Sequence, residues 1–208
     1  MINNLKSYSG ADRDFLSKML KIAIPIMAQN LITSSLNMVD TIMVGKLGEV
    51  EIAAVGIANQ YFFFYSMILV GLCAGCSVFI SQYWGKQDYV NIKKILGLGL
   101  FSALLVSIVF MAIGFVNPGG IISIFNKDST VIELGGKYLF IVLFSYIFTA
   151  VTFVYSFSLR SIGNTFAPLI VNIAALLCNT LFNYILIFGK FGAPALGVEG
   201  AAIATLIA

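Results

Sequence analysis

Residues 95–116 read ILGLGLFSALLVSIVFMAIGFV, a run that contains no charged side chain. The hydrocarbon core of a bilayer is about 30 Å thick, so a helix that crosses it needs about 20 predominantly apolar residues. The run has the length and composition of a transmembrane helix, and it therefore indicates a membrane protein.

Further apolar runs lie on both sides of this one. The sequence predicts membrane-spanning helices over residues 22–44, 53–80, 95–116, 135–158, 168–188 and 197–208, and we interpret the last of these as truncated. Residues 1–21 are polar and form a predicted cytoplasmic segment, whereas residues 22–208 form a predicted transmembrane domain. Residues 117–137 mix apolar and charged side chains, which predicts a short helix at the outer interface.

The composition excludes several classes of protein. Apolar residues make up 60% of the chain and charged residues 10%, against about 45–50% and about 25% in soluble domains. The 12 Lys and Arg residues form no basic patch, so we do not expect nucleic-acid binding. The sequence has no His and only three Cys. We therefore expect neither an enzyme nor a bound cofactor.

The distribution of positive charge predicts the orientation, because cytoplasmic loops are enriched in Lys and Arg. With the N-terminus inside, eight basic residues are cytoplasmic: Lys6, Arg13, Lys18, Lys21, Lys86, Lys93, Lys94 and Arg160. Four basic residues are then outside: Lys46, Lys127, Lys137 and Lys190. The excess favours a cytoplasmic N-terminus in a multi-pass protein of the cell membrane.

The first predicted helix carries a polar face made of Gln29, Thr33, Asn37, Asp40 and Thr41, which recur at spacings of three and four. An ionisable side chain inside a membrane costs about 2.5–3.5 kcal/mol on insertion scales, so it needs a reason to be there. We therefore interpret Asp40 as a functional residue.

The fifth predicted helix carries Asn172, Asn179 and Asn183 on one face, and Thr205 lies in the sixth. At 1.5 Å per residue, Asp40 lies about 27 Å along its helix, and Asn179 and Asn183 lie about 16 and 22 Å along theirs. These groups are therefore expected at a similar depth. Their oxygen atoms can form a cage for a hard cation such as Na⁺, or Asp40 can take up and release a proton.

The alternative interpretation is that the Asn and Thr side chains only hydrogen-bond helices to one another, which is common in membrane interiors. The candidates for lining a polar cavity are Gln29, Thr33, Asn37 and Asn172.

Five stretches, in order, carry a family resemblance. They are Pro25 with Gln29; Asp40 to Gly48; Ser81 to Gly85; Arg160 to Asn164 followed by Pro168, Asn172, Asn179 and Asn183; and Gly189 to Gly197 followed by Gly200 to Thr205. Together they resemble the MATE (multidrug and toxic compound extrusion) transporters.

The resemblance implies twelve transmembrane helices in two six-helix lobes, of which this chain is similar to the N-terminal lobe. It also implies a cation site formed by Asp40, Asn179, Asn183 and Thr205. Some members have Asp where this chain has Asn183, so this site has one carboxylate fewer. The implied partners are an organic cation as substrate, the lipid bilayer and the missing C-terminal lobe.

We therefore expect a Na⁺- or H⁺-coupled antiporter that exports organic cations, as in multidrug efflux. One alternative is a related flippase or exporter of an amphipathic metabolite or lipid-linked precursor, because the polar helix faces suit either cargo. Another is an ion channel with Asp40 in its selectivity region, but the sequence contains no filter motif.

Overall fold

The computed structural model describes the backbone of residues 2–208 and the side chains of residues 15–17 and 19–208. In this part of the chain all regular structure is helical. The helices are α1 (Ile2–Gly45), α2 (Glu49–Gly85), α3 (Tyr89–Val116), α4 (Pro118–Phe125), α5 (Ser129–Val142), α6 (Ser145–Ser161), α7 (Phe166–Phe188) and α8 (Gly197–Ile207). The prediction of an all-helical fold is confirmed.

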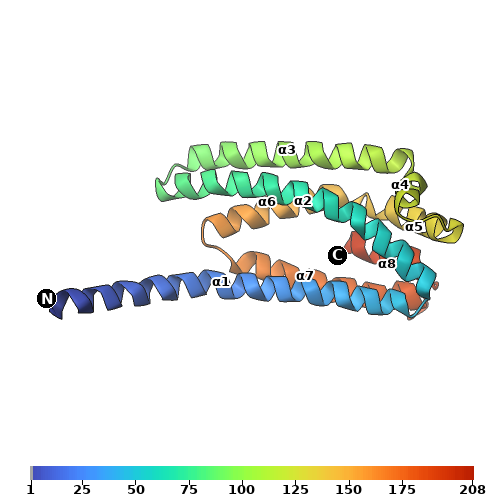
Figure 1. Ribbon diagram of the computed structural model, residues 1–208, viewed down its shortest axis with the longest axis horizontal. Helices are drawn as coiled ribbons and strands as arrows, with labels where there is room; N and C mark the ends of the chain where they lie inside the picture. Colours follow the sequence, from blue (N-terminus) through green and yellow to red (C-terminus); the bar gives the residue numbers. More distant parts are fainter. Residues whose placement is uncertain (1) are drawn as a thin grey trace.

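Four helices are long and apolar enough to cross a membrane, namely α1 over Phe15–Gly45, α2, α3 and α7. The bent pair formed by α5 and α6 makes a fifth span if the two are counted together. The polar N-terminal segment is not separated from the first span, because α1 continues without a break from Ile2 to Gly45 and projects past the other helices (Figure 1).

The sequence predicted one continuous helix over residues 135–158, and this prediction is wrong. The structure has two helices there, α5 and α6, bent by 53°. At the break, Phe144 N donates to Ile141 O (3.3 Å) and Tyr146 N donates to Leu143 O (3.1 Å), so the bonds reach back three residues instead of four. The Ser145 hydroxyl donates to Val142 O (2.7 Å). A serine that binds a backbone carbonyl and a tightened turn both bend helices.

The helices form two groups. Helix α1 packs along α7, while α2 packs against α3, α5 and α6, and α8 joins the groups by packing against both α5 and α7 (Figure 1). The close approach of α8 to α7 depends on Gly200, because a Cβ atom at this position would lie 2.6 Å from Leu186 O. The grouping brings the C-terminal parts of α1 and α7 together.

Candidate cation site

Asp40 lies on α1, just over one turn before the helix ends at Gly45. Its Oδ1 accepts a hydrogen bond of 2.6 Å from Nδ2 of Asn183 on α7. The same Nδ2 donates a second hydrogen bond of 2.7 Å to Oδ1 of Asn179. The structure therefore brings three of the four predicted site residues into one hydrogen-bonded cluster, which we call the Asp40 cluster (Asp40, Asn179 and Asn183).

The packing of α7 against α1 explains why these side chains meet. Asn179 and Asn183 are four residues apart and therefore share one face of α7, and they are only 2% and 1% exposed. The α1 face around Asp40 continues into the buried Met43 and Val44. Buried polar groups require hydrogen-bond partners, and each helix supplies them to the other.

One oxygen atom in the cluster has no partner. Both hydrogens of the Asn183 amide nitrogen are used, on Asp40 and Asn179, and its Oδ1 is buried without a hydrogen bond. An amide oxygen beside a carboxylate is the type of ligand that a hard cation prefers. The cluster can therefore supply oxygen ligands to a small cation at Asp40 once the Asn183 amide turns its oxygen toward the carboxylate.

Thr205, the fourth predicted site residue, does not bond to this cluster. Its hydroxyl donates to Ala201 O of its own helix α8 (3.0 Å). The Tyr138 side chain of α5 lies near the Thr205 hydroxyl. Among the described side chains, no hydrogen bond joins Thr205 to the Asp40 cluster.

Sequence reasoning missed Tyr138, which is 5% exposed. The chain has nine tyrosines, and Tyr138 lies in no polar stripe that would single it out. Only the packing of α5 against α8 brings it to this position.

The candidates for lining a cavity have different surroundings. Gln29 is 1% exposed and closed in, because its Nε2 donates to Thr165 O (2.8 Å) and its Oε1 accepts from Nη2 of Arg160. Gln29 thereby joins α1 to the end of α6 and the start of α7. Asn172 is partly buried on α7.

Thr33 and Asn37 are exposed on α1, and the Thr33 hydroxyl donates to Gln29 O (3.0 Å). With Asn30, Ser34 and Thr41 they form an exposed polar face of α1, because all five lie on adjoining helical positions. A polar face on a membrane-spanning helix is expected to lie against protein or water and not against lipid.

Within the described residues there is no group of three or more His, Cys, Asp or Glu side chains that could hold a metal ion. The donor set of the Asp40 cluster, with one carboxylate and two amides, carries a single negative charge. This charge matches a monovalent cation better than a divalent one.

The fold and the sequence both match one family of membrane transporters. The MatE family model matches residues 25–185, and the chain therefore belongs to this family. A probable multidrug resistance protein NorM of Thermotoga maritima is 29% identical over 91% of this chain and 41% of its own length. The corresponding protein of Synechocystis is 33% identical over 91% of this chain and 41% of its own length.

Solved structures agree with this assignment. The MATE multidrug transporter DinF-BH superposes with a TM-score of 0.84 at 26% identity, over 92% of this chain and 42% of the transporter. An outward-facing MATE family transporter of the MOP superfamily superposes with a TM-score of 0.82 at 22% identity, over 91% of this chain and 41% of that transporter. The chain spans about 41% of its relatives, and its fold is that of the N-terminal lobe of a MATE transporter.

Proposed function

We propose that this chain is the N-terminal lobe of a cation-coupled antiporter that exports organic cations across the cell membrane. The observation that carries the proposal is the Asp40 cluster, in which a carboxylate inside a spanning helix faces an amide with an unpartnered oxygen. The proposal places the N-terminus in the cytoplasm and Na⁺ or H⁺ at Asp40, Asn179, Asn183 and Thr205, with no other cofactor.

The cluster supports an exchange of partners at Asp40. Without a cation, one N–H of the Asn183 amide donates to Asp40 and offsets part of its negative charge. When Na⁺ or a proton binds the carboxylate, the N–H contact is no longer needed, and the amide can turn its oxygen toward the cation. Because Asp40 and Asn183 lie on different helices, the exchange changes the interaction between α1 and α7.

The ion can drive export only if it binds one conformation of the transporter more tightly than the other. We propose that ion uptake from the outside favours the state that releases the organic cation, and that ion release inside reverses this preference. The exposed polar face of α1 forms one wall of the substrate cavity, and the C-terminal lobe of the full-length protein forms the other.

The test is efflux of a fluorescent organic cation from cells that express the full-length protein, with Asp40→Asn as the variant and surface expression matched. Asparagine keeps the shape of the side chain but has no charge to titrate or to attract Na⁺. We expect the wild type to extrude the dye and the variant to retain it. Equal extrusion by both would show that Asp40 does not couple the ion to transport.

Two further experimental conditions distinguish Na⁺ from H⁺ as the coupling ion. Efflux is measured in membrane vesicles with an imposed Na⁺ gradient at constant pH, and with an imposed pH gradient in the absence of Na⁺. Stimulation by only one gradient identifies the ion, and stimulation by neither contradicts the antiport mechanism. If the wild type extrudes no cationic dye but exports an amphipathic or lipid-linked compound, the alternative cargo is correct. Single-channel currents in a planar bilayer would indicate a channel.

A further inference from the structure

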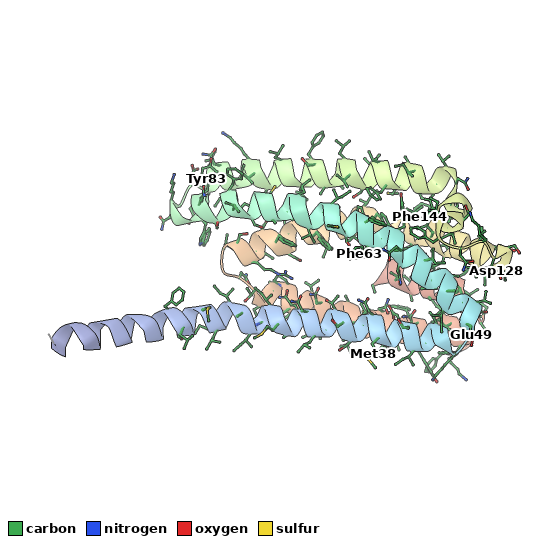
Figure 2. All side chains as sticks on the ribbon, viewed as in Figure 1. Met38, Glu49, Phe63, Tyr83, Asp128 and Phe144 are labelled. Atoms are coloured by element: carbon green, nitrogen blue, oxygen red, sulfur yellow. The ribbon has the colours of Figure 1, made fainter. Side chains whose placement is uncertain are left out.

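One end of the lobe carries four basic side chains where α2 and α6 end and α3 begins. We call Lys86, Lys93, Lys94 and Arg160 the basic rim. The three lysines are exposed and Arg160 is partly buried. Figure 2 shows Tyr83, near the end of α2, at the opposite end of the lobe from Glu49 and Asp128.

A contact between α2, α3 and α6 shows how far each rim residue lies along the long axis of the lobe. A Cβ atom on Gly99 of α3 would lie 3.3 Å from Sγ of Cys76 and 3.5 Å from Cγ1 of Val154. Positions 76, 99 and 154 therefore lie at one level, which we call the Gly99 level. From the Gly99 level α2 and α6 run forward, and α3 runs backward, to the same end of the lobe (Figure 1).

A rise of 1.5 Å per residue places Lys93, Lys94 and Arg160 together, at about 8–9 Å from the Gly99 level. Lys86 lies about 15 Å from it by the same count. Three positive charges on two different helices therefore share one height, and a fourth lies within about two helical turns of them. Charged side chains at the same depth on membrane-spanning helices lie against the same layer of the bilayer.

The basic rim has few negative charges to balance it. Among the described side chains the one ion pair within 4 Å joins Lys137 to Glu133 on α5, at the other end of the lobe. Among the side chains that the structure describes, Asp88 is the acidic residue beside the rim, and its carboxylate caps α3 by accepting from Asn91 N (3.1 Å) and Asn91 Nδ2 (2.6 Å). These hydrogen bonds, together with the nearby Lys94, lower the pKa of Asp88. Asp88 therefore stays charged, but it is one carboxylate against four basic groups.

Arg160 also has unused hydrogen-bonding capacity. Its Nη2 donates to the neutral amide of Gln29, and the guanidinium lies 5.5 Å from the centre of the Phe157 ring. Its Nε is buried and has no hydrogen-bond partner. None of these contacts neutralises the positive charge of the guanidinium.

Two exposed aromatic side chains lie beside the rim. The rings of Trp84 and Tyr89 pack edge to face with centroids 5.9 Å apart, and Trp84 is 42% exposed. By the count of 1.5 Å per residue, Trp84 lies about 12 Å and Tyr89 about 15 Å from the Gly99 level. Trp and Tyr are enriched at the headgroup level of membranes. The aromatic pair therefore indicates that Lys86 lies at the height of lipid headgroups, with Lys93, Lys94 and Arg160 about 3–7 Å closer to the Gly99 level.

We propose that the basic rim binds the phosphate groups of anionic phospholipids. Unpaired lysines next to the end of a transmembrane helix attract anionic headgroups, and the positive charge of Arg160, which has no acidic partner within 4 Å among the described side chains, adds to this attraction. The charges lie within about 7 Å of the height of the aromatic pair, and this closeness favours a bilayer over a soluble anion. The proposal goes beyond drug export and does not depend on it, because it concerns the lipid and not the cargo.

The test uses the full-length protein in vesicles of phosphatidylglycerol and phosphatidylcholine, in which one lipid at a time is brominated near the glycerol end of an acyl chain. Bromine quenches nearby tryptophan, and the difference between wild type and Trp84→Phe isolates the Trp84 signal. We expect brominated phosphatidylglycerol to quench Trp84 more strongly than the same fraction of brominated phosphatidylcholine. Equal quenching by both lipids would overturn the proposal.

The decisive variant is K86Q/K93Q/K94Q, which removes three charges and leaves Arg160 and its bond to Gln29 intact. Each basic residue near the surface contributes about fivefold to anionic lipid binding, so the preference for phosphatidylglycerol should fall at least fivefold. Retention of the full preference would contradict the proposal. The single variants K86Q and K93Q should each show part of the loss, which keeps the test valid if the triple variant does not fold.

Two matched controls show whether a loss of lipid preference is caused by the charges of the basic rim. K86R/K93R/K94R keeps the charges and should keep the lipid preference. K46Q/K127Q/K190Q removes the same charge at the other end of the lobe and should also keep it. An equal loss in this second control would show that net charge, and not the basic rim, sets the preference, and it would overturn the proposal.

Discussion

The Asp40 cluster differs in an instructive way from a second buried polar group in the same lobe. The second group, which we call the Tyr65 cluster, consists of Tyr65, Ser107 and Tyr146. The Tyr65 hydroxyl donates to Tyr146 O (2.7 Å) and lies 2.8 Å from the Ser107 hydroxyl. The Tyr65 and Tyr146 rings stack with centroids 4.3 Å apart.

Both clusters join helices, and both contain a buried atom without a partner, Asn183 Oδ1 in one and the Tyr146 hydroxyl in the other. The difference is the kind of group around that atom. The Tyr65 cluster consists of neutral hydroxyls and a backbone carbonyl next to the α5–α6 break, whereas the Asp40 cluster contains a carboxylate whose charge can change. An unpaired polar atom alone therefore does not identify a functional site. We propose an ion site only at the Asp40 cluster, because there the unpaired oxygen belongs to an amide that is hydrogen-bonded to a carboxylate.

The largest contrast is expected in transport. Asp40→Asn should reduce gradient-driven dye efflux at least about tenfold, because coupling between an ion and its cargo is typically a 5–150-fold effect. Tyr65→Phe should leave most of the efflux intact, since it removes a hydroxyl that bonds to the backbone. Efflux rates normalised to surface expression measure both. A similar loss of efflux in the two variants would contradict the prediction that the Asp40 cluster, and not the Tyr65 cluster, takes part in transport.

Exchanging the Asp40 and Asn183 side chains tests this prediction further. The double variant Asp40→Asn with Asn183→Asp moves the carboxylate to the other side of the same hydrogen bond. We expect it to recover part of the efflux that Asp40→Asn loses, because a carboxylate again faces an amide. No recovery would show that the charge must be on α1.

The single variant Asn183→Asp places two carboxylates at hydrogen-bonding distance in place of one. Adding a negative charge beside a bound cation strengthens the attraction, and the proton or Na⁺ concentration that gives half-maximal efflux should fall about tenfold. The measurement is efflux rate against Na⁺ concentration and against pH. An unchanged ion dependence would place the ion elsewhere.

In the Tyr65 cluster the expected effect is on stability. Tyr65→Phe should lower the free energy of unfolding by about 0.6 kcal/mol, the average measured for hydrogen bonds between membrane helices, and by no more than about 1.7 kcal/mol, the measured maximum. Thermal unfolding of the purified full-length protein in detergent measures this change. Thr149→Val is a suitable comparison, because its hydroxyl bonds only within its own helix, to Ser145 O. A larger loss in Thr149→Val than in Tyr65→Phe would contradict the structural role of the Tyr65 hydroxyl.

The smallest effect is expected at Thr205. Its hydroxyl already bonds to Ala201 O, so Thr205→Val should change folding little and weaken ion dependence only severalfold, the loss of one of several ligands. Thr205→Ser keeps the hydroxyl and should behave as the wild type. If Thr205→Val matches the wild type in ion dependence, Thr205 is not a ligand of the ion.

Several features of the site could be predicted from the sequence. The polar faces of the first and fifth predicted helices were visible in the spacing of Asp40, Asn179 and Asn183, because helical periodicity is local. Their similar depth followed from counting residues along two helices that run in the same direction. The structure then showed a direct hydrogen bond between the two faces.

Other features could not be predicted in this way. Gln29 belongs to the same sequence stripe as Asp40, but it bonds to Arg160 and Thr165 far along the chain. The break between α5 and α6 lies inside an apolar run without proline, and the sequence therefore predicted a continuous helix. At the break the Ser145 hydroxyl bonds locally to Val142 O, whereas the bond from Tyr65 to Tyr146 O reaches across from α2 and depends on how the helices pack.

The sequence by itself determined the helical membrane fold, the family and the polar faces of individual helices. These properties depend on composition, on apolar runs of bilayer length and on the period of the helix, all of which are local along the chain. Only the tertiary structure decided which polar faces meet, where the fourth predicted helix bends, and that Tyr138 lies near Thr205. Such contacts depend on how α1, α5, α7 and α8 pack, and packing joins residues that are far apart in the chain.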